Sequence, residues 1–73
     1  MKIYGYYSKD QEEPVEFQEA TIIATPEELK NIAKFFSLAA DELEKKDSDS
    51  HLHYQDYINP GDYQLPDLIV YKK

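Results

Sequence analysis

The two histidines of the chain, His51 and His53, are the first groups whose type and spacing could support chemistry. Residues two apart on a β-strand point to the same side, so both imidazoles would share one face. Such a pair can chelate a transition metal, and Asp49 or Asp56 could add an oxygen ligand. No third ligand stands at a diagnostic spacing, however. We therefore interpret both histidines as surface or interface side chains and expect no metal and no other cofactor.

The carboxylates could serve acid–base catalysis, which needs two carboxyl groups held in a cleft that separates their pKa values. Residues 10–19 and residues 47–67 instead contain scattered acidic groups without a lysine, and a domain this small must leave most of them in solvent. Gly5 and Gly61 are the only glycines and cysteine is absent. These facts exclude a glycine-rich phosphate loop, a thiol nucleophile and a disulfide framework. The sequence predicts that the protein is not an enzyme.

Length and charge limit the remaining classes. A chain of 73 residues forms one small domain, residues 1–73, with a thin margin of stability. Its 15 acidic residues exceed its eight basic residues, all of them lysine, which gives a net charge of −7. This balance argues against nucleic acid and anionic membranes as partners and favours a basic partner. The residues after Met1 are too few and too polar for a signal-peptide core, so we expect a cytoplasmic protein.

The clearest element that could position these groups is a helix after Thr25. Thr25 suits the N-cap, Pro26 the first helical position, and Glu28 closes a capping box. Apolar residues then recur at helical spacing and predict the stripe that faces the core. This stripe consists of Leu29, Ile32, Ala33, Phe36, Ala40 and Leu43. Phe35 and Leu38 fall outside it, beside Glu42, and either contact a partner or lie under a terminus or loop.

Four strands are expected, at residues 2–7, 15–24, 51–58 and 68–71. The second either alternates strictly or has a bulge near residues 18–19; the pattern leaves both open. The resulting ββαββ order predicts an α+β domain with a mostly antiparallel four-stranded sheet and one helix packed on one face. The uncovered face would carry Tyr4, Tyr6, Ile69 and Tyr71. It is either a contact face or a twisted surface with solvated tyrosines.

Several segments together resemble the immunity protein 32 family. They are residues 19–30 (EATIIATPEELK), 32–35 (IAKF), 39–44 (AADELE), 51–54 (HLHY) and 66–70 (PDLIV). The chain departs from the expected pattern at Tyr63, where a larger aromatic residue would precede Pro66 and Asp67. The resemblance implies a bacterial protein that binds and blocks a cognate toxin of a polymorphic system, as in contact-dependent growth inhibition. Such toxins are often nucleases with basic surfaces.

The resemblance and the charge together predict a cytoplasmic immunity protein. It would neutralise a basic, nuclease-type protein toxin by occluding its active or substrate-binding site. The alternative is a small acidic homodimeric adaptor or regulator whose uncovered sheet face is the dimer interface; a metal-dependent enzyme built around the two histidines is the least supported reading. The predicted partner-binding residues are Tyr4, Tyr6, Phe35, Leu38, Glu42, His51, His53, Asp56, Asp62, Tyr63 and Tyr71.

Overall fold

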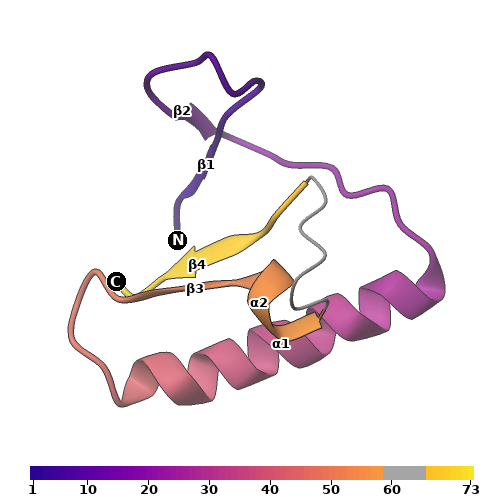
Figure 1. Ribbon diagram of the computed structural model, residues 1–73, viewed down its shortest axis with the longest axis vertical. Helices are drawn as coiled ribbons and strands as arrows, with labels where there is room; N and C mark the ends of the chain where they lie inside the picture. The colour runs from indigo at the N-terminus through magenta and orange to yellow at the C-terminus, as the bar shows by residue number, and fades with distance from the viewer. Residues whose placement is uncertain (59–65) are drawn as a thin grey trace.

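The computed structural model of the protein describes residues 1–58 and 66–73. Its elements are β1 (Ile3–Gly5), β2 (Val15–Phe17), α1 (Pro26–Glu44), β3 (His51–His53), α2 (Tyr54–Ile58) and β4 (Ile69–Tyr71). The α+β class and the predicted ββαββ order are confirmed, with the short helix α2 added between the last two strands. Figure 1 shows the N-terminal strands standing apart from the layer formed by α1, β3 and β4.

The strands form two separate antiparallel sheets in the described part of the chain, β1–β2 and β3–β4. The single four-stranded sheet predicted from the sequence is therefore not confirmed. The predicted second strand stops at Phe17 instead of residue 24, and the third stops at His53 because Tyr54 begins α2. A segment with high strand propensity forms a ladder only where a neighbouring strand supplies hydrogen bonds. Residues 18–24 have no such neighbour among the described residues.

Helix α1 begins as the sequence predicts. Thr25 has extended backbone angles and its hydroxyl accepts a hydrogen bond from the Glu28 N–H at 3.1 Å. The Glu28 carboxylate accepts in return from the Thr25 N–H at 3.0 Å. At the other end, the Lys72 ammonium group donates to the carbonyls of Glu44 and Lys46, so a side chain beyond β4 satisfies carbonyls at the end of α1.

The buried face of α1 differs from the predicted one. Phe35 is only 1% exposed and Ala39 and Leu43 are also buried, whereas Phe36 is 46% exposed and Leu29 is exposed too. The prediction that Phe35 lies outside the core is wrong. Apolar residues occupy two neighbouring stripes of this helix, and packing against the sheet and α2 selects the stripe through Phe35.

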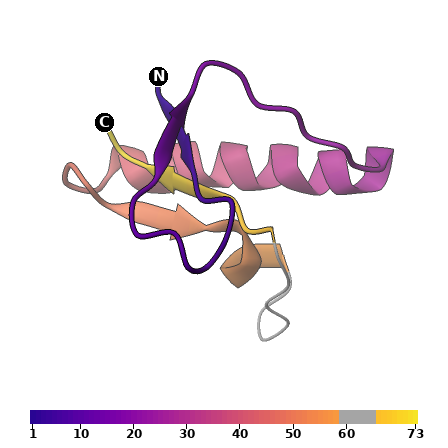
Figure 2. The ribbon, with the colours of Figure 1, turned by 90° about the horizontal axis from the view of Figure 1, so that it is seen from above.

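The core lies between α1, α2 and one face of the β3–β4 sheet. The Phe35 ring meets Tyr54 edge-on at a centroid distance of 5.4 Å and lies 5.9 Å from Tyr57, both from α2. Leu52 and Val70 are directly paired across β3 and β4, and Val70 lies beside Leu43 of α1. Figure 2 shows α1 running along one side of this sheet. In the described part of the chain, no helix is long and apolar enough to span a bilayer.

Replacing Phe35 with alanine should lower the free energy of unfolding by about 3–5 kcal/mol, because it leaves a cavity at the centre of the aromatic cluster. The matched change Phe36→Ala should cost about 1 kcal/mol, since that ring is already half in solvent. Urea unfolding followed by circular dichroism measures both values. Equal losses for the two variants would contradict the assigned helix face.

The capping box predicts a pH-dependent term in stability. The hydrogen bond from the Thr25 backbone, and then the one with its side chain, lower the pKa of the Glu28 carboxyl. A carboxyl with a lowered folded-state pKa stabilises the fold above its unfolded pKa, and this stabilisation is lost as the pH falls through the folded value. Glu28→Gln should therefore destabilise at neutral pH and match the wild type in acid. Glu27→Gln, which leaves the capping bonds in place, is the control, and a pH-independent difference for Glu28→Gln would contradict the assignment.

Candidate partner-binding surfaces

The side of the β3–β4 sheet that faces away from α1 brings three predicted site residues together. His51 pairs with Tyr71 and His53 with Ile69 across the two strands, and these four residues form what we call the His–Tyr face. The His51 ring stacks on Tyr71 at 4.6 Å and meets His53 edge-on at 5.3 Å. Tyr71 is 64% exposed and Ile69 is exposed as well. Ile69 and Tyr71 therefore share an uncovered face, but the prediction that Tyr4 and Tyr6 lie on the same face is wrong, because β1 belongs to the other sheet.

Asp67 fixes the position of the His53 ring on the His–Tyr face. One carboxylate oxygen, Oδ2, lies 2.8 Å from Nδ1 of His53. The other, Oδ1, accepts hydrogen bonds from the backbone N–H groups of Gln55 at 3.1 Å and Leu68 at 2.8 Å. With the carboxylate as acceptor, Nδ1 of His53 carries a proton and donates it to the hydrogen bond with Oδ2. One side chain thus joins the end of β3, the start of α2 and the approach to β4.

Sequence reasoning missed Asp67 because it treated this residue as one of the scattered, solvated carboxylates. The available signal was its position directly before a strand and after Pro66, where an aspartate commonly accepts hydrogen bonds from nearby backbone N–H groups. The hydrogen bond to His53 could not be predicted from local sequence, because His53 lies 14 residues away in the chain.

The other predicted site residues lie elsewhere. Tyr4 is exposed on β1 and Tyr6 is exposed just after it, on the sheet that does not contain Tyr71. Leu38 is exposed on α1, with Glu42 half-buried one turn later, and Asp56 is exposed on α2. Phe35 leaves the candidate set because its ring is the centre of the core. Asp62 and Tyr63 lie outside the described residues.

Within the described residues, the two histidines have no third side chain placed beside them as a metal ligand. Among residues 1–58 and 66–73, no three His, Cys, Asp or Glu side chains are placed to hold a metal ion. The carboxylate that contacts His53, that of Asp67, also accepts hydrogen bonds from two backbone N–H groups. The described chemistry of the His–Tyr face is therefore hydrogen bonding and aromatic contact.

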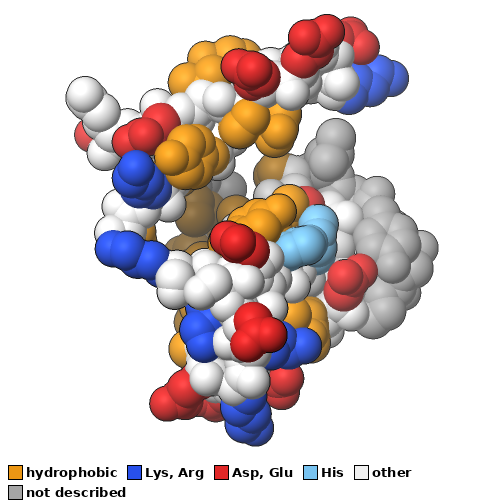
Figure 3. Space-filling view, turned by 90° about the vertical axis from the view of Figure 1, so that its left-hand side faces the viewer, with side chains coloured by type: hydrophobic (Ala, Val, Ile, Leu, Met, Phe, Trp, Pro, Cys, Tyr) orange, Lys and Arg blue, Asp and Glu red, His pale blue; other side chains and the backbone are white. Residues whose placement is uncertain are grey.

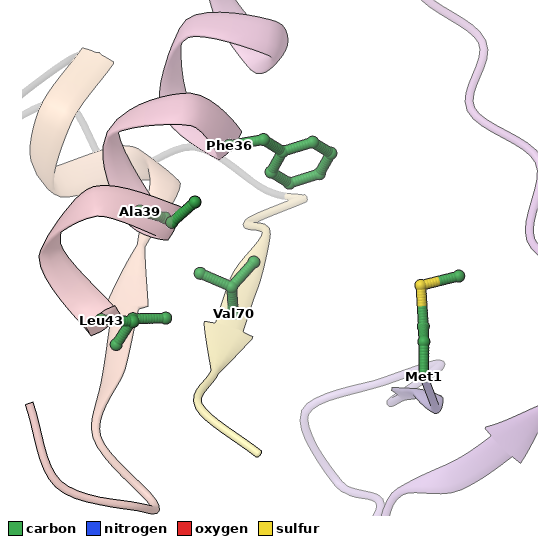
Figure 4. A pocket seen from close by; sticks show the side chains of 6 residues that line it. Met1, Phe36, Ala39, Leu43 and Val70 are labelled. Carbon is green, nitrogen blue, oxygen red and sulfur yellow. The ribbon is translucent and has the colours of Figure 1, made fainter.

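An open apolar pocket lies between the N-terminus and α1. It has a volume of about 320 Å³ and is lined by Met1, Phe36, Ala39, Ala40, Leu43 and Val70. Figure 4 shows Phe36, Ala39 and Leu43 on α1 and Val70 on β4 at one side, with Met1 opposite. The space-filling view in Figure 3 shows hydrophobic side chains around a hollow in the face that carries histidine. Phe36 and Ala40, which are exposed, line this pocket together with the buried Ala39 and Leu43.

The negative charge is concentrated in one stretch of the chain. Residues 10–29 contain seven Asp or Glu residues and no lysine, whereas the other eight acidic residues are balanced by the eight lysines. The whole net charge of −7 is therefore carried by this stretch, which we call the acidic segment. It runs from the β1–β2 turn to the first turn of α1, and every carboxylate residue in it is exposed.

These features define a small acidic α+β protein that exposes aromatic, apolar and charged groups. The family model described as Immunity protein 32 matches residues 19–73. The chain therefore belongs to the immunity protein 32 family, which confirms the resemblance found in the sequence. The match includes the His–Tyr face and Asp67. No curated protein and no solved structure matches the chain.

Substitution of Asp67 tests its role behind the His–Tyr face. Asp67→Ala should lower the free energy of unfolding by about 2–3 kcal/mol, because two half-buried backbone N–H groups lose their acceptor. Asp67→Asn keeps an acceptor oxygen for those groups and should cost about 1 kcal/mol or less. Chemical denaturation gives both values, and the Nδ1 chemical shift of His53 reports its bond. If alanine and asparagine were equivalent, the backbone bonds to Asp67 would not matter for stability.

Proposed function

We propose that this protein binds a basic, nuclease-type toxin and neutralises it stoichiometrically by covering its active or substrate-binding site, without catalysing a reaction. Membership of an immunity protein family supports the toxin-binding role. We infer that the partner is basic from the location of the negative charge. All of the net negative charge lies in the acidic segment, on exposed side chains.

A concentrated negative field has two effects on a basic partner. It steers diffusional encounter and so raises the association rate, and it places carboxylates where a nuclease would hold the phosphates of its substrate. The segment contains no lysine to weaken this field. Occlusion of a substrate-binding cleft by charge complementarity follows from these two effects. The protein would act in the cytoplasm, where a nuclease toxin meets its substrate.

Charge alone gives weak binding, so apolar and aromatic anchors are also needed. The His–Tyr face offers the exposed rings of Tyr71 and His51, held in a fixed geometry by stacking. The pocket under Met1 offers an apolar recess that can accept a side chain of the partner. Both surfaces lie outside the acidic segment and supply the short-range contacts that it lacks. Tyr4 and Tyr6 remain predicted contacts on the N-terminal strands.

The direct probe for this proposal is the cognate toxin domain, obtained by pull-down of the bound protein from the bacterium that produces this chain and then purified on its own. We expect a complex with one copy of each protein and loss of nuclease activity at a one-to-one ratio. Stopped-flow mixing should show association slowing by about tenfold or more between low and high salt, because exposed charges are screened beyond about 8 Å at physiological ionic strength. Binding with a flat salt profile would contradict steering by charge, and absence of binding would contradict the immunity role.

A further inference from the structure

Residues 19–24, in the chain between β2 and α1, have no backbone partner among the described residues. In the described part of the structure, no backbone hydrogen bond is made by residues 19–24, and the β1–β2 ladder ends at the Ile3–Phe17 pair. Figure 1 shows this connection as a drawn-out trace across the molecule. Its N–H and C=O groups are therefore open to a second strand, as they are at the edge of a sheet.

The side chains of this connection suit strand pairing. Thr21, Ile22 and Ile23 form a β-branched run, the residue type most enriched in strands. Ile23 is 96% exposed and Ile22 is 52% exposed. Two adjacent isoleucines in solvent, on an unpaired backbone, have the properties of a strand whose partner is missing. The pattern also explains why the sequence predicts a strand through residue 24 although the ladder stops at Phe17.

Charge selects the partner. Glu16 and Glu19 precede the β-branched run and Glu27 and Glu28 follow it, and all four side chains are exposed. A second copy of this chain would bring like charges together across the new strand pair, which is destabilising. A strand bearing Lys or Arg would instead meet opposite charges at both ends.

We propose that residues 19–24 dock as an added β-strand on a Lys/Arg-rich edge strand of the toxin. This inference rests on the proposed function and names the contact within it. Main-chain hydrogen bonds would supply affinity, Ile22 and Ile23 would pack against the two faces of the toxin sheet, and the flanking glutamates would fix the register. The docking site is defined by the unpaired backbone of residues 19–24 and the exposed side chains of Ile22 and Ile23, not by the acidic residues alone.

Proline substitution tests the pairing, because consecutive residues of a strand direct their N–H groups to opposite edges. Docking through one edge predicts that only one of Thr21→Pro and Ile22→Pro weakens binding of the cognate toxin domain, by about tenfold or more relative to its matched control. The matched controls are Thr21→Ala and Ile22→Ala, which keep the N–H. The proposal fails if both prolines bind as tightly as their alanine controls, or if both weaken binding equally.

Hydrogen exchange of the unmodified protein provides a second test that needs no variant to fold. Amides in residues 19–24 should exchange rapidly in the free chain and become protected at alternate positions in the complex. A complex that forms and inhibits the toxin but leaves these amides unprotected would overturn the docking strand and leave the proposed function standing. A wild-type protein that does not bind the toxin would overturn both.

Two further experiments test the contribution of the flanking glutamates and the alternative that a second copy of this chain pairs with residues 19–24. The double variant Glu16→Gln/Glu19→Gln should slow association several-fold at low salt, whereas Asp41→Asn/Glu44→Gln, on the exposed surface of α1, should change it little. Equal slowing by both pairs would contradict a register fixed by the flanking glutamates. Sedimentation of the free chain covers self-pairing: a dimer dissolved by Thr21→Pro or Ile22→Pro would assign the strand to a second copy and overturn the proposal.

Discussion

The packing of Phe35 against Tyr54 and Tyr57 is the contact on which the rest of the described fold depends. Phe35 is the only large side chain of the described residues with less than 2% of its surface exposed. Its ring attaches α2 to α1, and the attachment of α2 fixes where β3 ends and how β4 approaches it. Few side chains are buried besides it, so a small domain concentrates its stability in this cluster.

Asp67 is the polar counterpart of Phe35 on the other side of the β3–β4 sheet. Its carboxylate bonds to His53 and to the backbone of Gln55 and Leu68, which belong to three consecutive parts of the fold. The same bonds that connect these parts also orient the imidazole on the His–Tyr face. Asp67 therefore both connects these parts and fixes the orientation of the His53 ring.

The molecule divides into a packed part and an open part. The packed part consists of α1, β3, α2 and β4, and it carries the His–Tyr face. The open part is the N-terminal strands with the connection to α1, and it holds five of the seven carboxylates of the acidic segment. The exposed carboxylates of the acidic segment therefore lie mostly on the open part, and the stacked rings of His51 and Tyr71 lie on the packed part.

The sequence by itself determined the features that depend on neighbouring residues in the chain. The Thr25–Glu28 capping box, the start of α1, the ββαββ order, the family and the net charge all follow from local pattern or composition. The face of α1 that is buried did not follow, because its apolar residues occupy two stripes and only the position of α2 and the sheet chooses between Phe35 and Phe36. The extent of the strands and the bond between His53 and Asp67 were also decided by tertiary structure, since a ladder or a side-chain bond needs a partner distant in the chain.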